Sequence, residues 1–261
     1  MHLLKFVVPA HDNRIHLTTK SYMVKPFEVP PALKIFHDQS IDGLEFCKLA
    51  YARFDEIITL PDDGHTLRER KGYIKQLIEE ILPICRYIQT FYSQGRYLSV
   101  RWMHGSQHFD AKVQSTGTAV DRGWWPSEGT LEVTQAVHVN EYLSRELLNA
   151  DGACFGLDGI TRVKDTAGKR RIESKPTAYH NESYILDMCS IILKAIAPKV
   201  SKMADGHYPA DTTLIVDCAL ITIFAPHEWE KLVSMVRDSL PSHGFKRIFL
   251  TATSEMYYAT L

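Results

Sequence analysis

The clearest hydrophobic pattern lies near the C-terminal end of the chain, where an amphipathic segment separates two apolar runs. Residues 213–224 are almost continuously apolar, as expected of a strand buried on both faces, and residues 247–253 form a second run. Between them, Pro226 suits the first turn of a helix whose apolar positions recur at helical spacing. A strand, a helix and a strand in this order predict a right-handed parallel crossover.

Alternating apolar and polar residues mark the middle of the chain. Two such runs, 96–103 and 108–115, flank the turn-forming residues 104–107, which predicts a β-hairpin. A third short strand is expected at 130–136, and it leads into an amphipathic helix that Gly152 ends. The middle of the chain is therefore predicted to hold three strands followed by a helix.

Three further segments have the 3.6-residue spacing of amphipathic helices: 44–58, 67–92 and the segment that starts at Asn181. Pro83 lies within the second segment and Pro198 within the third, and a proline inside a helix removes a backbone hydrogen bond. We expect Pro83 to kink or split its helix, and Pro198 to bend or end the other.

Taken in chain order, these elements predict an α/β fold, a mixed central β-sheet with helices on both faces. Residues 153–180 are rich in Gly, Lys and Arg and are interpreted as a loop or a short hairpin. A turn signal at 61–64 marks the expected boundary between two parts. These are an N-terminal extension or small subdomain, residues 1–64, and an α/β domain, residues 65–261.

Composition narrows the class of protein. The chain has 30 basic and 31 acidic side chains, which argues against a protein held on nucleic acid by its overall field, although a local groove can still be positive. The five cysteines form no CxxC pair, and no run of about 18 apolar residues occurs. No signal-peptide pattern is present. A globular, cytoplasmic protein without a membrane partner is expected.

Asp110 and Glu132 give the sharpest chemical signal. Alternation places Asp110 and Lys112 on the polar face of their strand, and Glu132 and Thr134 on one face of the next strand. A buried carboxylate needs a cation or strong hydrogen bonds, and Mg²⁺ bound by one or two carboxylates meets that need. If the strands are neighbours, both carboxylates converge on one divalent metal. The alternative is that Asp110 belongs to a solvated polar face.

These residues form a wider pattern: a helix carrying Glu, a hairpin with Asp in its second strand, a strand with Glu-x-(Lys or a substitute), and another helix. The pattern resembles the common core of the PD-(D/E)XK, restriction-endonuclease-like superfamily, in particular an uncharacterised bacterial and phage-related branch. The matching residues are Asp110, Glu132 and Thr134, with Glu79 or Glu80 as the helix carboxylate.

The resemblance covers about residues 71–261 and implies a restriction-endonuclease-like core. It implies a Mg²⁺-dependent (or Mn²⁺-dependent) endonuclease that hydrolyses phosphodiester bonds in nucleic acid, with DNA expected ahead of RNA. Asp110, Glu132 and Glu79 are the implied metal ligands. A phage-defence or mobile-element context fits this resemblance, and a homodimer is one arrangement that it allows.

Thr134 departs from the family pattern, because the family usually has a lysine there that positions water and stabilises developing charge. Thr134 carries no positive charge. Either another lysine takes this place, or the fold has lost catalysis and serves as a nucleic-acid or protein binding module. Both readings stay open. The candidates for the replacement are Lys112, Lys175, Lys199 and Lys202.

Basic residues elsewhere are candidates for phosphate contacts. They are the run Lys169, Arg170 and Arg171, the helix-end residues Lys199 and Lys202, and His180 at a helix start. For the run, the alternative is a solvated loop, and for His180 a capping or surface residue. The chain has no GxGxxG, P-loop, GxSxG or HExxH motif, so it gives no support to the enzyme classes that these motifs mark.

Overall fold

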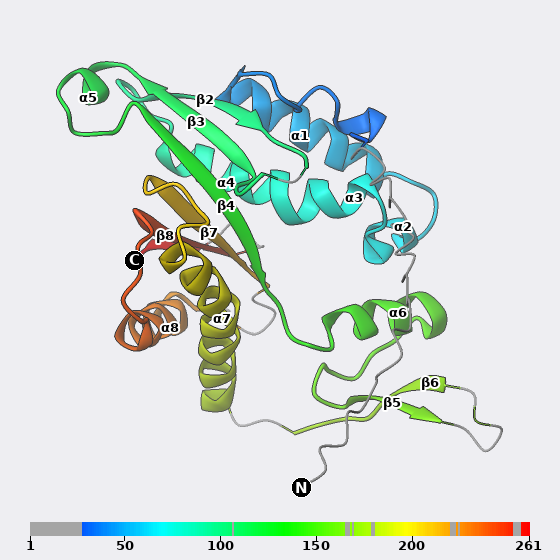
Figure 1. Ribbon diagram of the computed structural model, residues 1–261. Helices are drawn as coiled ribbons and strands as arrows, with labels where there is room; N and C mark the ends of the chain where they lie inside the picture. The colour runs from blue at the N-terminus through cyan, green and yellow to red at the C-terminus, as the bar shows by residue number, and fades with distance from the viewer. Residues whose placement is uncertain are drawn as a thin grey trace, which may run out of the picture.

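The computed structural model describes residues 28–105, 107–164, 168, 170–178, 181–219, 223, 225–252 and 257–261. Within these residues the chain forms a mixed central sheet with helices packed on both of its faces (Figure 1). The predicted α/β fold is confirmed.

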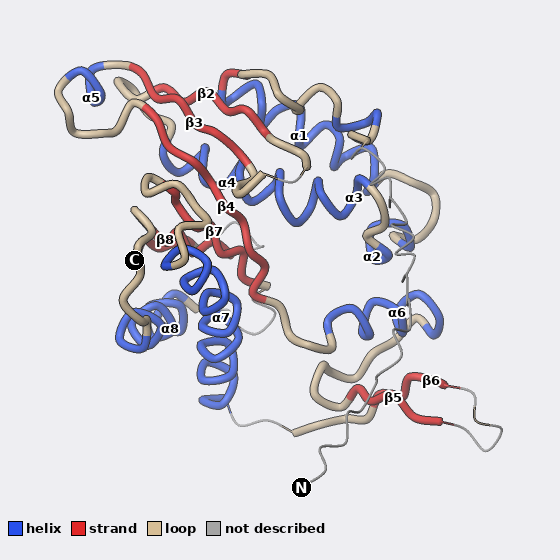
Figure 2. The backbone as a smooth tube through the Cα atoms, viewed as in Figure 1, coloured by secondary structure: helices blue, strands red, loops and turns tan. Residues whose placement is uncertain are grey.

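The described residues contain a seven-stranded sheet in the order β1-β2-β3-β4-β7-β8-β9 (Figure 2). The central pairs β4–β7 and β7–β8 are parallel, and the remaining neighbours are antiparallel. This arrangement confirms both the predicted hairpin and the predicted parallel crossover. The strands are β1 (Ile41–Asp42), β2 (Tyr97–Trp102), β3 (Ala111–Thr116), β4 (Glu128–Ala136), β7 (Thr212–Cys218), β8 (Arg247–Ala252) and β9 (Tyr258–Thr260).

Helices cover each face of the sheet and enclose a separate apolar core. On one face α1 and α4 pack over Leu131, Val133 and Ile215, and on the other α7 and α8 pack over Leu214 and Val216. The predicted burial of β7 on both faces is confirmed. The helices are η1 (Pro31–Leu33), α1 (Gly43–Ile58), α2 (His65–Glu69), α3 (Tyr73–Gln76), the π-helical η2 (Leu77–Ile81), α4 (Leu82–Phe91), α5 (Thr118–Asp121), α6 (Glu141–Asp151), α7 (Asn181–Ala204) and α8 (Pro226–Ser239).

The prediction of a single helix over residues 67–92 is wrong at its start. Arg70 and Gly72 have φ angles of 46° and 56°, a left-handed conformation that interrupts a right-handed helix. The chain then becomes helical again, and η2 comes directly before Pro83 and α4. Pro83 cannot donate a backbone hydrogen bond, which fits an irregular turn at this point. In contrast, α7 continues past Pro198 to Ala204.

The predicted boundary at residue 64 falls between α1 and α2. The structure shows α1 in the same apolar core as α4, and β1 paired with the edge of β2. Gly43 allows this contact, because an added Cβ would lie 2.9 Å from the backbone oxygen of Leu98 and 2.8 Å from Ile88. Residues 31–58 therefore share the core of the α/β domain, whereas residues 1–27 lie outside the described part of the chain.

Between α6 and α7 the chain forms a separate hairpin of β5 (Ile160–Lys164) and β6 (Arg170–Ser174). Of the loop and the short hairpin considered for residues 153–180, the structure shows the hairpin. Figure 1 shows this hairpin beside α6 and away from the central sheet. Lys169 and His180, two of the expected phosphate-binding residues, lie outside the described residues. Across the described part of the chain, no helix is both long and apolar enough to cross a membrane.

Candidate functional site

Asp110 and Glu132 lie opposite each other on adjacent strands. Asp110 comes just before β3 rather than within it, but its N–H donates to the carbonyl of Leu131 at 2.8 Å. The β3–β4 register pairs Ala111 with Leu131, so its next step pairs Asp110 with Glu132. Directly opposed residues in an antiparallel pair have Cβ atoms about 4.5–5.5 Å apart. The metal hypothesis required these two strands to be neighbours in the sheet, and this part of the prediction is confirmed.

Both carboxylates lie on the sheet face that α7 covers. Ala111 and Leu131 belong to the core on the α4 side, and side chains alternate between the faces of a strand. The residues next to them, Asp110 and Glu132, therefore point to the opposite face. Lys112 alternates in the same way and is exposed, as the hairpin pattern predicted.

Glu132 is buried and is held by two donors that come from a distant part of the chain. Its side chain is 10% exposed, and its Oε1 accepts hydrogen bonds from Lys199 Nζ and, at 3.1 Å, from the hydroxyl of Tyr208. Lys199 lies on α7, and Tyr208 follows that helix in the loop before β7. A buried carboxylate without such partners would strongly destabilise the fold, so these contacts make the position of Glu132 tenable.

Asp110 occupies an environment that disfavours its charge. Burial raises the pKa of Asp110 well above its usual range, and the negative charges of Glu132 and Glu80 raise it further. Two contacts oppose this rise in the pKa: the N–H of Val133 donates to Asp110 Oδ2 at 2.7 Å, and Lys199 contributes positive charge. Burial and the neighbouring negative charges therefore favour the protonated form of Asp110 over its carboxylate.

Glu80, rather than Glu79, is the helix carboxylate of this cluster. Burial raises the pKa of Glu80, and the charges of Glu132 and Glu79 add to the rise, while the indole N–H of Trp102 donates to Glu80 Oε2 at 3.3 Å and opposes it. The two glutamates occupy consecutive positions of the π-helical turn η2, whose side chains diverge.

Glu79, expected as a metal ligand, is engaged elsewhere. Its carboxylate lies 3.5 Å from Arg70, and the hydroxyl of Tyr142 on α6 donates to it at 3.1 Å. These partners fix Glu79 on the side of the molecule where α2 and α6 meet. The structure thus places Glu79, expected as a metal ligand, away from Asp110 and Glu132, and Glu80 is the helix carboxylate whose charge acts on Asp110.

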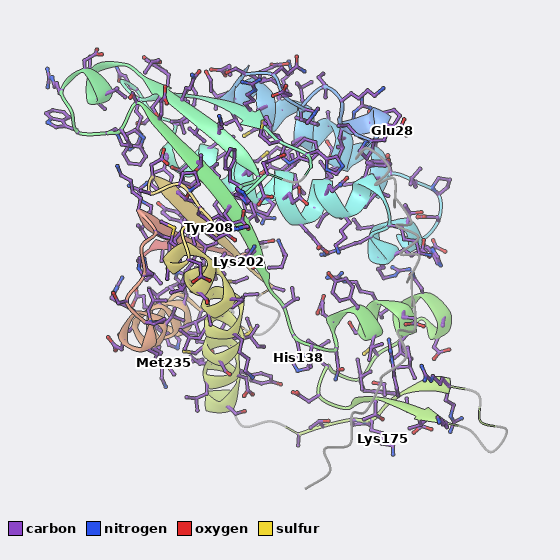
Figure 3. The ribbon with its side chains drawn as sticks, in the orientation of Figure 1. Glu28, His138, Lys175, Lys202, Tyr208 and Met235 are labelled. Atoms are coloured by element: carbon purple, nitrogen blue, oxygen red, sulfur yellow. The ribbon has the colours of Figure 1, made fainter. Side chains whose placement is uncertain are left out.

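Of the four lysines considered as replacements, Lys199 is the one that contacts the cluster among the described residues. The exposed ammonium group of Lys112 lies 5.6 Å from the ring of Phe109. Lys202 lies on α7, and Figure 3 shows it near Tyr208, whereas Lys175 lies beside the β5–β6 hairpin. Thr134 is partly buried two residues beyond Glu132 on β4 and carries no charge.

Arg170 and Arg171 do not join the acidic cluster. Both are exposed on β6, where they line a groove of about 420 Å³ with Arg162 and residues of α6. Arg171 also forms an ion pair with Glu173. If these arginines contact phosphates, they do so at a second surface, on the β5–β6 hairpin, which Figure 1 shows beside α6 and away from β4.

The donors at the cluster suit a hard divalent cation. In the described part of the chain, no group of three or more His, Cys, Asp or Glu side chains is already arranged around a metal position. Mg²⁺ does not require one, since it binds through one or two carboxylates and otherwise through water and phosphate oxygens. The carboxylates of Glu80, Asp110 and Glu132 repel one another, and a divalent cation would offset this repulsion.

Tyr208 was not identified from the sequence, and Lys199 was identified only as one of several lysines. They lie 76 and 67 positions from Glu132, so the local pattern around Glu132 contains no sign of either contact. Comparisons of the chain with protein-family models, with curated proteins and with solved structures found no match. The functional argument therefore rests on the geometry of this cluster.

Proposed function

We propose that the protein is a metal-dependent nuclease that hydrolyses phosphodiester bonds in nucleic acid. The observation that carries the proposal is the placement of Asp110 opposite Glu132, whose carboxylate accepts a hydrogen bond from Lys199, with Glu80 near enough for its charge to act on Asp110. Carboxylates whose charges repel one another beside a partly buried lysine are found more often at functional sites than in ordinary packing.

The order of elements supports the proposal. A helix carrying Glu80 precedes the β2–β3 hairpin with Asp110, and β4 with Glu132 follows. The chain then crosses through α7 to β7, which pairs with β4 in parallel. This is the succession that the resemblance to the PD-(D/E)XK superfamily implies, and the pairing of β3 with β4 brings Asp110 and Glu132 to one face of one sheet.

Asp110 and Glu132 are the proposed metal ligands, with Glu80 beside them. Bound Mg²⁺ or Mn²⁺ would polarise a phosphate oxygen and lower the pKa of an attacking water. The positive charge of Lys199 is suited to stabilise the charge that develops on the phosphate, and Tyr208 fixes the orientation of Glu132. Lys199 thus supplies, from α7, the charge that Thr134 lacks.

Nucleic acid is the proposed partner, with DNA ahead of RNA. Lys202 is exposed at the end of α7, one helical turn beyond Lys199, where a phosphate backbone entering the site would pass. Arg170 and Arg171 offer a second basic surface on the hairpin, and Lys169, next to them in the sequence, stays a proposed phosphate contact. His180, which precedes Asn181 in the sequence, stays a proposed phosphate contact.

The test is cleavage of plasmid DNA and structured RNA by the tag-free protein in Mg²⁺, Mn²⁺ or EDTA. Glu132→Gln removes the buried charge, and Glu128→Gln is the matched control because Glu128 is exposed on the same strand. Cleavage that needs the metal, is lost in Glu132→Gln and is retained in Glu128→Gln would support the proposal. Cleavage that survives Glu132→Gln would refute this site. Absence of cleavage with intact nucleic-acid binding would favour an inactive fold acting as a binding module.

A further inference from the structure

Two histidines from distant parts of the chain meet beside the carboxylate cluster. His108 Nδ1 and His207 Nε2 are 3.1 Å apart, and both side chains are exposed. The ring centres are 4.1 Å apart at an interplanar angle of 66°, so the rings meet at an angle rather than head-on. One bent hydrogen bond between two exposed imidazoles adds little to the stability of the fold, because both rings could form hydrogen bonds with water instead.

Each histidine is adjacent to a residue of the cluster. His108 lies two residues before Asp110, and the ring of His207 packs edge-on against Tyr208, with the ring centres 5.2 Å apart. The backbone N–H of His207 also donates to the carbonyl of Lys202 at 2.9 Å, which holds the loop against the end of α7. The pair thus joins the two segments that supply Asp110 and Tyr208.

We propose that His108 and His207 form a two-imidazole site for a borderline transition-metal ion such as Ni²⁺, Cu²⁺ or Zn²⁺. With metal–nitrogen bonds of about 2.0–2.1 Å, two imidazole ligands have their nitrogens about 2.9 Å apart at an octahedral corner and about 3.3 Å apart in a tetrahedron. The observed 3.1 Å lies between these separations. Water or a substrate oxygen completes the coordination.

This site differs in chemistry from the carboxylate cluster. Neutral imidazole nitrogens select Zn²⁺, Ni²⁺ and Cu²⁺, whereas carboxylate and water ligands suit Mg²⁺ and Mn²⁺. Affinity at the histidine pair should rise from Mn²⁺ through Co²⁺ and Ni²⁺ to Cu²⁺ and fall again for Zn²⁺. The proposal does not depend on nuclease activity, because it concerns binding by two other residues.

Metal binding at this pair is expected to tie the loop before β3 to the loop after α7. Amide hydrogen exchange in residues 107–111 and 205–211 should then slow when the metal is added, since local opening of either loop requires a metal–nitrogen bond to break. Carboxylate-bound Mg²⁺ would not have this effect on His207. The two ions can therefore be distinguished by the loops that they protect.

The experiment is Ni²⁺ titration of the tag-free full-length chain, followed by calorimetry and by amide exchange. The variants are His108→Ala, His207→Ala and His207→Gln, in which the amide keeps a hydrogen bond but not the imidazole ligand. His138→Ala is the control, because His138 instead lies 3.0 Å from Asp158 and away from Tyr208 (Figure 3).

The proposal predicts that one bound equivalent of Ni²⁺, together with the protection of both loops, is lost in all three pair variants and retained in His138→Ala. Ni²⁺ binding that is unchanged in His108→Ala and His207→Ala would overturn it, as would a wild-type chain whose loops Ni²⁺ does not protect. Loop protection by Ni²⁺ that persists in His207→Gln would show that the imidazole of His207 is not a ligand, which would also overturn it.

Discussion

Lys199 donates a hydrogen bond to the buried carboxylate of Glu132 across the gap between α7 and β4. Lys199 lies on the crossover helix α7. In the Glu-x-Lys pattern that this chain resembles, the lysine instead lies on the strand, two positions beyond the glutamate, where this chain has Thr134. A positive charge therefore returns to the carboxylate cluster from another element.

Replacement of Lys199 by methionine should reduce cleavage by about 10²-fold or more, because a preorganised charge aimed at the reacting group is lost. Lys199→Arg keeps the charge and should retain part of the activity. Lys194→Met, at an exposed position of the same helix outside the proposed site, is the matched control and should change the rate only slightly. Single-turnover cleavage rates measure these effects. Equal losses in the two methionine variants would show that Lys199 has no special role.

Asp110→Asn should stabilise the metal-free protein at neutral pH while abolishing cleavage. The pKa of Asp110 is raised by burial and then by Glu132, so the folded state keeps a proton that the unfolded chain releases. Stability of the wild type consequently falls as pH rises from the unfolded pKa, about 3.9, through the raised folded pKa. Asparagine has no such titration and can still accept from the N–H of Val133.

Urea unfolding in EDTA at several pH values measures this difference. The stability gain of Asp110→Asn should be present at pH 8 and should shrink towards pH 4, where both the folded and the unfolded wild type are protonated. Each unit by which the folded pKa exceeds the unfolded one corresponds to about 1.4 kcal/mol. An Asp110→Asn variant that is less stable than the wild type at pH 8 would contradict the argument that the charge of Asp110 destabilises the folded protein.

Tyr208→Phe removes one hydrogen bond to Glu132 and leaves the bond from Lys199 in place. We expect a loss of about 1 kcal/mol in the free energy of unfolding, as is usual for one hydrogen bond. Cleavage should fall less than in Lys199→Met, since the charge remains. Thermal unfolding and the cleavage rate of the same preparation test both points, and a loss of cleavage as large as that of Lys199→Met would show that Tyr208 does more than orient Glu132.

Arg86 and Asp217 form a buried ion pair at 2.7 Å between α4 and the central strand β7. Asp217→Asn should destabilise the fold by about 3–5 kcal/mol, because it removes a negative charge from beside a buried guanidinium group. The exposed pair of Arg101 and Asp38 is the control, and Asp38→Asn should change stability by less than about 1 kcal/mol. Urea midpoints compare the two, and similar midpoints would contradict the structural role.

The sequence predicted the sheet well because burial patterns are local. The alternation before Thr116 and the apolar run at β7 identify strands directly, and Gly152, with a φ angle of 71°, ends α6 as expected. The break at Arg70 and Gly72 escaped prediction because helical spacing continues across it.

The sequence predicted the two opposed carboxylates of the candidate site, but not the side chains that contact them. Asp110 and Glu132 are adjacent through strand pairing, which the hairpin pattern implies, but the partners of Glu132 reach it through tertiary packing of α7. The choice between Glu79 and Glu80 depended on the direction of side chains in a π-helical turn, and 3.6-residue spacing cannot give that direction.

The most direct test of the central claim is Mn²⁺ binding followed by electron paramagnetic resonance, with wild type, Glu132→Gln and Glu128→Gln at matched concentrations. The account predicts one bound Mn²⁺ that is displaced by Mg²⁺, absent in Glu132→Gln and retained in Glu128→Gln. A wild type that binds no Mn²⁺, or a Glu132→Gln variant that binds it as well as the wild type does, would contradict the assignment of Asp110 and Glu132 as metal ligands.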